Sequence, residues 1–137
     1  MEEYKVQEVN YTDTACKFVD KRWGYERWFA NNKKEDYCGK ELFIKEGCFT
    51  SMHYHKKKHE VFYILKGTLR LNTLDKESGT IYTGILETGT KFEVSRNVPH
   101  QLIADGGDVT LIEASTYHRD SDSYRVFKEL SGDGSSR

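Results

Sequence analysis

The stretch GCFTSMHYHKKKHEVFYILKG, residues 47–67, decides how this sequence is interpreted. On a β-strand, side chains two residues apart point to the same side, so we expect His53 and His55 to project together. Residues 56–59 then form a tight connection. Glu60 opens the neighbouring antiparallel strand and can present its carboxylate beside the two imidazoles. One hairpin is therefore predicted to supply three potential ligands.

Imidazole and carboxylate groups together suit a divalent ion of Fe, Mn, Ni, Co or Zn. Three or four protein ligands on such an ion leave positions for substrate or water. His100 completes the set if the strand that it begins lies opposite in the fold. Alternating histidines can also be surface residues, and a lysine-rich run is usually a solvated loop. The strand that follows is apolar on both faces, which favours one divalent transition-metal ion on His53, His55, Glu60 and His100.

The rest of the chain reads as many short strands. Runs rich in Val, Ile, Phe, Tyr and Thr alternate with turn residues such as those at 66–67, 77–79, 88–89 and 105–108. The pattern predicts strands at 40–46, 49–55, 60–66, 68–74, 80–86, 91–95, 100–104, 108–115 and 123–128. Nine short strands indicate an all-β sandwich or barrel.

The length of 137 residues indicates one domain, which we place at residues 1–130. Residues 1–20 lack sustained helical spacing and are predicted to form an N-terminal arm or edge strand. The barrel is expected over about 21–128. Residues 131–137 are small and polar, so a flexible C-terminal tail is expected there.

Composition argues against several partner classes. Twenty-one basic and 22 acidic residues give a net charge of -1, which offers no electrostatic footprint for nucleic acid or an anionic membrane. No signal peptide or stretch of eighteen apolar residues is present, so a cytoplasmic protein is expected. Three cysteines without a C-x-x-C pair indicate reduced thiols, although Cys38 and Cys48 could pair on neighbouring strands. Strands such as 61–65 are apolar on both faces, so the face turned away from the barrel interior is expected to be covered by a second sheet or by a partner subunit, which suggests a homodimer.

At this point a resemblance becomes specific. The run 47–67 resembles the first signature of the cupin superfamily: a glycine, five residues, His-x-His, four residues, Glu, six residues and Gly. The second signature is met by Gly89, Pro99 and His100, but the glycine usual between the last two is absent, and Ala104 stands where asparagine is common. The resemblance implies a single-domain cupin jelly-roll β-barrel, an ion held by the histidines and glutamate, and often a homodimer.

A finer resemblance extends beyond these signatures. The segments KRWGYE (21–26), YCGKELFIKEG (37–47) and TYHRDSDSYR (116–125) are similar to parts of the cupin domain of type II mannose-6-phosphate isomerases. That similarity implies aldose–ketose isomerisation, in which a metal polarises the substrate while a nearby base moves a proton. Spacing does not identify the base. Lys40, His59 and Glu113 are the candidate catalytic residues, and each can instead be a solvent-facing or paired charge.

Other polar and aromatic groups carry two interpretations each. Lysines 56–58 could attract a phosphate or carboxylate, or could simply form a soluble turn. Trp23, Tyr25 and Trp28 could stack on a sugar, or could pack in the core or at a dimer interface. His118, Asp120 and Asp122 are expected to form a polar surface cap.

The leading hypothesis is a metal-dependent enzyme acting on a small polar metabolite, in its sharpest form a sugar-phosphate isomerase or epimerase. A second hypothesis uses the same ligands with Fe as a lyase or dioxygenase of a small carboxylated metabolite. A third is a non-catalytic barrel that binds a metal or sugar. An enzyme requires a base within hydrogen-bond reach of its substrate, whereas a binding protein does not.

Overall fold

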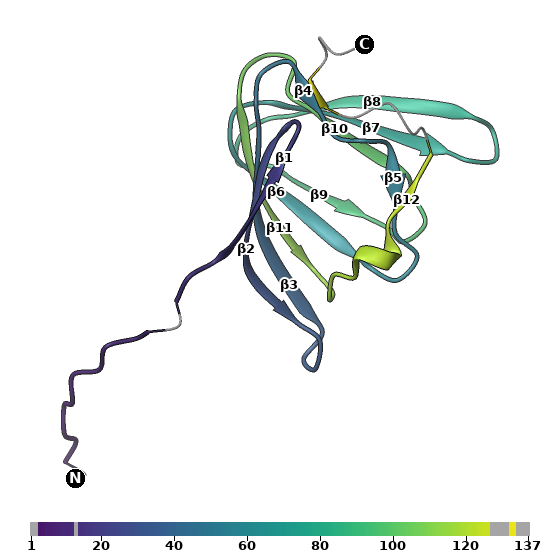
Figure 1. Cartoon of the computed structure of the whole chain (residues 1–137). Helices are drawn as coiled ribbons and strands as arrows, with labels where there is room; N and C mark the ends of the chain where they lie inside the picture. Colours follow the sequence, from purple (N-terminus) through teal and green to yellow (C-terminus); the bar gives the residue numbers. More distant parts are fainter. Residues whose placement is uncertain (1–2, 13, 127–131, 134–137) are drawn as a thin grey trace.

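The computed structural model describes residues 3–12, 14–126 and 132–133, and it is built almost wholly from strands (Figure 1). In chain order the elements are β1 Lys17–Lys21, β2 Gly24–Asn32, β3 Tyr37–Ile44, β4 Cys48–Phe49, β5 His53–Tyr54, β6 Glu60–Lys66, β7 Leu69–Asp75, β8 Thr80–Leu86, β9 Lys91–Val94, β10 His100–Ile103, β11 Val109–Ser115, the 3₁₀ turn η1 Asp120–Asp122, β12 Tyr124–Arg125 and β13 Gly132–Asp133. Within this described part, no helix is long and apolar enough to cross a membrane.

Two antiparallel sheets face each other around one apolar core (Figure 1). The six-stranded sheet has the order β1-β2-β3-β11-β6-β9. The other sheet runs β12-β5-β10-β4-β13, with β7 bridging β10 to β8. Alternate residues of both sheets point inward, so that Ile44, Ile64, Leu69 and Leu111 are fully buried between them. The predicted all-β jelly-roll architecture is confirmed.

The predicted strand at 49–55 is divided in the structure. Ile103 of β10 pairs with Phe49, whereas His100 pairs with His53. The two paired positions are therefore three residues apart on β10 but four residues apart on the segment 49–53. The extra residue is a local irregularity that breaks regular pairing and re-aims the side chains that follow it. The predicted bounds of 60–66 and 80–86 match β6 and β8.

A long hairpin precedes the predicted strands. β1 pairs with β2 along its whole length, and β2 pairs with β3, which extends the six-stranded sheet. Trp23, in the turn between β1 and β2, is buried in the core. The described residues before β1 form an extended arm that projects away from the barrel (Figure 1).

The last part of the barrel differs from the expected strand at 123–128. Only Tyr124 and Arg125 pair with β5, and residues 127–128 lie outside the described residues. Within the expected C-terminal tail, β13 pairs with β4. Residues 131 and 134–137 of that tail lie outside the described part. Cys38 and Cys48 are both buried, and no disulfide joins them.

Candidate metal centre and pocket

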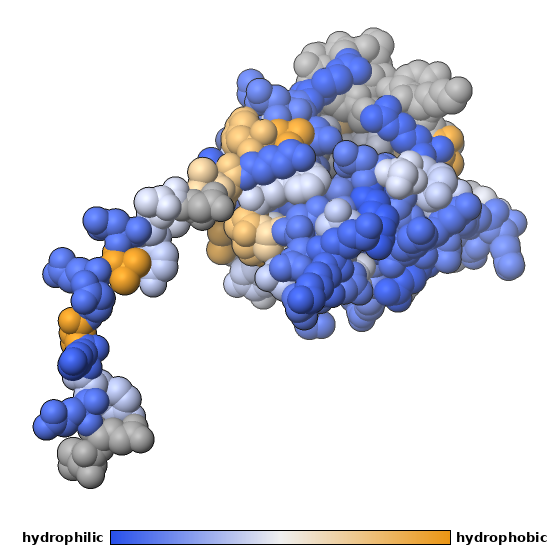
Figure 2. All heavy atoms as spheres, turned by 60° about the horizontal axis from the view of Figure 1, so that its bottom comes forward, coloured by the Kyte–Doolittle hydropathy of each residue, from blue (hydrophilic) through white to orange (hydrophobic). Residues whose placement is uncertain are grey.

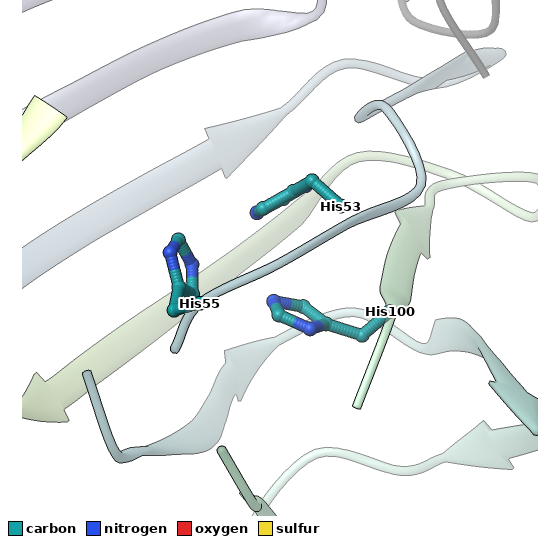
Figure 3. Close-up of side chains that lie close together, drawn as sticks. All are labelled: His53, His55 and His100. Carbon is teal, nitrogen blue, oxygen red and sulfur yellow. The ribbon is translucent and has the colours of Figure 1, made fainter. Parts of the chain in front are cut away.

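Three histidines meet between the two sheets (Figure 3). His53 begins β5, His55 follows it, and His100 begins β10 opposite. One ring nitrogen of each lies within 4.8 Å of the others. The structure therefore brings together the two histidines of the hairpin and the more distant His100, whose side chain enters the site although the usual glycine before it is missing.

Backbone carbonyls orient all three rings in the same way. A carbonyl oxygen only accepts hydrogen bonds, so the Nδ1 beside it carries the proton and leaves Nε2 with a free lone pair. Such bonds also hold metal-binding imidazoles in position. The Nδ1 atoms lie 2.9 Å from the carbonyl oxygen of Ser51 for His53, 2.8 Å from that of Asp122 for His55, and 3.0 Å from that of Val98 for His100.

Burial keeps the hairpin imidazoles neutral. Desolvation, and then the neighbouring imidazoles, lower the pKa of His53 well below its ordinary value. Desolvation also lowers the pKa of His55, even though the Glu60 carboxylate opposes the shift. A neutral imidazole is the form that binds a metal ion.

Glu60 places a buried carboxylate oxygen beside these lone pairs. Its Oε2 lies 3.2 Å from His100 Nε2 and 3.4 Å from His55 Nε2, yet it has no hydrogen-bond partner among the described residues. Burial alone would raise the Glu60 pKa, but the Lys58 ammonium favours the ionised carboxylate, and this pKa lies far below its usual value. An ionised oxygen facing two lone pairs is the donor set that a divalent cation would satisfy. The residues present therefore fit a metal ion.

Lys58 is buried, although the lysine run at 56–58 was expected to form a solvated loop. Its side chain is only 3% exposed, and its Nζ lies 2.5 Å from Glu113 Oε2 and 3.6 Å from Glu60 Oε1. Burial on its own would lower the Lys58 pKa, but the two carboxylates outweigh burial and raise it. Lys58 is thus a buried cation that joins the predicted ligand Glu60 to Glu113 of β11.

Asp122 explains why this loop is fixed. The buried Asp122 carboxylate accepts hydrogen bonds of 2.9–3.2 Å from the backbone N–H groups of Lys56, Lys57 and Lys58. Its own carbonyl accepts the hydrogen bond from His55. One residue of η1 therefore holds both a histidine of the site and the loop that carries Lys58, so it is not the surface cap that the sequence suggested.

His118 connects the buried lysines to solvent. Its Nδ1 lies 3.1 Å from Lys58 Nζ and 3.3 Å from Lys40 Nζ, and its Nε2 lies 2.9 Å from the exposed Asp120 carboxylate. Desolvation, followed by the two ammonium groups, lowers the His118 pKa to about 4. Because a lysine ammonium only donates, the neutral ring accepts at Nδ1 and donates from Nε2 to Asp120.

The candidate catalytic residues lie in different places. Lys40 is buried on β3 with its Nζ 3.9 Å from the centre of the Trp28 ring and 3.6 Å from Glu26 Oε1. Burial, the largest influence, lowers the Lys40 pKa. Lys40 and Glu113 both line the pocket that contains the three histidines, whereas His59 pairs with Glu93 of β9 at 2.9 Å and is not among the lining residues.

The pocket has a volume of about 450 Å³, and residues of the β1–β2 hairpin are among those that line it. Trp28 also lines it, and the ammonium groups of Lys17 and Lys40 lie 4.4 and 3.9 Å from the centre of its ring, so the ring packs against two cations. Tyr25 instead stacks on Phe43, with 5.2 Å between ring centres, on the other face of the sheet. Six cationic and three acidic side chains line the pocket: Lys17, Lys21, Arg22, Lys40, Lys58, Arg125, and Glu26, Glu113 and Asp120.

Sequence reasoning undervalued three residues of this site. Lys58 lies in a lysine run whose pattern favours a soluble turn, and the positions of His118 and Asp122 after the barrel favour a surface cap. The only signal that pointed to the last two was the resemblance of 116–125 to a tail segment of the isomerase-like domains. Their roles depend on contacts more than fifty residues away in sequence.

Comparison with known protein families identifies the chain. The cupin domain family matches residues 41–115, more than half of the sequence. This protein belongs to the cupin family. In this cupin, Gly47 and Gly67 of the first signature both adopt a φ of +85°, a left-handed conformation that favours glycine. A Cβ atom at Gly67 would contact the carbonyl of Asp108, whereas at Gly47 it would meet nothing within 4 Å.

Solved structures share the fold of this cupin. Oxalate decarboxylase of Bacillus subtilis is 17% identical with a TM-score of 0.71, covering 90% of this chain and 34% of that one. Oxalate decarboxylase of Lactobacillus farciminis is 18% identical with a TM-score of 0.70, and the match covers 90% of this chain and 38% of that one. The capsular polysaccharide assembling protein CapF of Staphylococcus aureus is 15% identical with a TM-score of 0.73, at 82% and 34% coverage. The chain thus spans about a third of these proteins. No curated protein sequence matches it.

Proposed function

We propose that this cupin binds one divalent transition-metal ion on His53, His55, Glu60 and His100. The observation that carries the proposal is the buried Glu60 Oε2, which lies 3.4 Å from His55 Nε2 and 3.2 Å from His100 Nε2 and has no hydrogen-bond donor among the described residues. Three negative or lone-pair-bearing groups directed at one point repel each other unless a cation lies between them. Fe, Mn, Ni, Co and Zn all accept this mixture of nitrogen and oxygen ligands.

The substrate that we propose is a small anion, with a sugar phosphate as its sharpest form. A pocket of about 450 Å³ is the size that one small metabolite fills. Its lining carries twice as many cationic as acidic side chains, although the whole chain has a net charge of -1. Positive charge concentrated in a cleft attracts an anionic ligand and orients its charged end.

The reaction that we propose is isomerisation or epimerisation. A bound ion would polarise the carbonyl and hydroxyl oxygens of the substrate. Lys40 is the proposed proton-transferring group, because burial lowers its pKa towards the range in which an amine exchanges protons. His118 accepts from Lys40 and donates to Asp120, which gives that proton a hydrogen-bonded path to solvent. Glu113 keeps Lys58 charged and in place, and remains the alternative base.

Elemental analysis tests the metal centre. The expected result is about one equivalent of metal per chain after loading, lost in the His53→Ala/His55→Ala variant and kept in His59→Ala, whose side chain lies outside the pocket. The bound metal should also raise the melting temperature of the unsubstituted protein and of His59→Ala only. Equal metal content in all three proteins, or none in any, would overturn the metal centre.

A proton-exchange assay tests the reaction. The loaded protein is incubated in D₂O with a panel of aldose and ketose phosphates, and deuterium incorporation is followed by NMR beside oxygen consumption. Incorporation that falls at least 100-fold in Lys40→Met but is retained in His59→Ala supports the proposal. If the protein instead consumes oxygen in the presence of a carboxylated metabolite, the isomerase proposal is wrong and the oxygenase hypothesis takes its place. If a sugar phosphate binds but no deuterium is incorporated, the isomerase proposal is wrong and the binding-protein hypothesis takes its place.

A further inference from the structure

A row of three side chains crosses the inner face of the sheet that carries the histidines. His100 of β10 pairs directly with His53 of β5, and His53 pairs in turn with Arg125 of β12. Directly paired residues of antiparallel strands have their side chains on the same face, with Cβ atoms about 5 Å apart. Arg125 is therefore the next side chain in this row after the two histidines, and it lines the same pocket as they do.

The neighbours of Arg125 hold β12 in this register. Tyr124 points to the opposite face of the sheet, where its ring stacks on Tyr54 with 5.3 Å between ring centres. On the other side of Arg125, the Val126 N–H donates a hydrogen bond of 2.9 Å to the Met52 carbonyl. Backbone pairing and the Tyr124 ring, rather than an ion pair, therefore direct the arginine towards the pocket.

Arg125 differs from the buried lysines of the pocket, because it forms no ion pair within the described part of the chain. Lys58 is paired with Glu113, and the Lys40 Nζ lies 3.6 Å from Glu26 Oε1. Carboxylates therefore already balance these two ammonium groups. Arg125 is exposed, so its guanidinium is available to a ligand that enters the pocket.

The proposed metal centre adds to the positive charge beside Arg125. A divalent ion with Glu60 as its only charged ligand keeps an excess of positive charge, and the guanidinium belongs to the adjacent strand. Two like charges close together in a cleft repel each other, and an anion bound between them removes this repulsion. The planar guanidinium presents paired N–H donors that match two oxygens of a phosphate or carboxylate group.

We propose that Arg125 binds the anionic group of the substrate, a phosphate or a carboxylate, while the reacting end of the same molecule lies at the metal centre. This inference rests on the proposed function, and it names the residue that selects a charged substrate over a neutral one. Arg125 is exposed, whereas His100 at the other end of the row is buried. The anionic group therefore lies on the solvent side of the pocket, and the reacting end lies inside.

The protein surface near this part of the pocket suits a charged ligand. The η1 turn leads into β12, and Asp120 and Ser123 from this segment also line the pocket. η1 lies towards the lower end of the barrel in Figure 1, and Figure 2 brings that end forward. Most of the barrel surface in that view is hydrophilic (Figure 2), which favours a polar ligand over an apolar one.

Calorimetric titration of the full chain with fructose 6-phosphate, gluconate and neutral fructose tests this assignment. Arg125→Gln should weaken binding of the preferred anion at least tenfold, because its charge-assisted hydrogen bonds are lost, and should leave the metal content and the affinity for fructose unchanged. Arg125→Lys keeps the charge without the paired donors, so an intermediate loss is expected.

Arg27→Gln is the matched control for these variants. It removes the same charge from an arginine that pairs with Glu41 and is not among the residues that line the pocket, so anion binding should be unchanged. Phosphorus NMR of fructose 6-phosphate with the Mn²⁺-loaded protein adds a readout of position. The bound ion should broaden the phosphate signal in the unsubstituted protein and in Arg27→Gln, and the broadening should largely disappear in Arg125→Gln.

The outcomes separate this inference from the metal centre. Equal affinities of Arg125→Gln and Arg27→Gln for both anions, in proteins that hold their metal, would overturn the role of Arg125 and leave the metal centre intact. If the chain binds no metal but still binds an anion through Arg125, the metal centre is wrong and the role of Arg125 stands. Failure of the unsubstituted chain to bind either anion, with or without metal, would overturn the inference. A preference for fructose 6-phosphate or for gluconate that depends on Arg125 supports it and identifies the anionic group.

Discussion

The Asp122 carboxylate offers the sharpest test of how this site is held together. It accepts hydrogen bonds from the backbone N–H groups of three successive lysines, 56–58. A hydrogen bond to a charged group is worth about 1.5–3 kcal/mol. After Asp122→Ala, the N–H groups of the exposed Lys56 and Lys57 can bind water, whereas that of buried Lys58 loses its partner. We therefore expect a loss of about 3 kcal/mol in the free energy of unfolding.

Two further variants sharpen this prediction. Asp122→Asn keeps one acceptor oxygen, so about half of the loss is expected. Asp120→Ala is the matched control, because Asp120 lies two residues away with a side chain that is 91% exposed, and its removal should cost less than about 0.5 kcal/mol. Urea denaturation of the metal-free proteins at pH 7 measures all three. Equal losses for Asp122→Ala and Asp120→Ala would refute the assignment of Asp122 as the anchor of the loop.

The pH dependence of the same contact has a definite sign. Burial alone would raise the Asp122 pKa, but the backbone donors outweigh burial and hold this pKa below its usual value. A depressed carboxyl pKa contributes stability above the pKa of the unfolded chain, near 4, and this contribution is lost as the pH falls through the lower folded value. The difference in stability between the unsubstituted protein and Asp122→Ala should therefore shrink below pH 4.

Three other predictions concern the neighbouring structure. Glu113→Gln leaves the Lys58 ammonium short of its nearest counter-charge and should cost about 3–5 kcal/mol; Lys58→Met combined with Glu113→Gln should restore part of this in a double-mutant cycle by urea denaturation. The ring of His118 should titrate by NMR near its lowered pKa of about 4, and in the metal-free protein its contribution to stability should decline as the pH falls from 6.5 towards 4, because only the unfolded chain is protonated in that window. Gly67→Ala should lower the melting temperature more than Gly47→Ala, because both sites need a positive φ but only Gly67 lies against the Asp108 carbonyl.

The hairpin at residues 53–60 shows how far local pattern can predict a site. Strand periodicity predicts His53 and His55 on one face, and the short connection between two strands predicts Glu60 beside them. In the structure Glu60 Oε2 lies 3.4 Å from His55 Nε2. Strand alternation and hairpin length are local properties of the backbone, so spacing alone carries this information.

His100 required more than local pattern. Its position at the start of a strand was predictable from Pro99, but its place opposite the hairpin depends on β10 lying beside β5. The resemblance to the second cupin signature supplied that arrangement. The order of strands in a sheet is set by the packing of the whole core, which short-range spacing does not report.

By itself, the sequence determined the all-β class, most of the strands from residue 37 onward and the hairpin that groups His53, His55 and Glu60, because strand periodicity and turn residues act over a few positions. Only the tertiary structure decided that Lys58 is buried, that Asp122 anchors its loop and that His118 leads from the pocket to solvent. The segment after β11 lies against the loop at 56–58, where Asp122 accepts a hydrogen bond from the Lys58 N–H and His118 contacts the Lys58 ammonium. Burial and charge pairing arise when distant segments pack together, so residue type and local spacing leave them undefined.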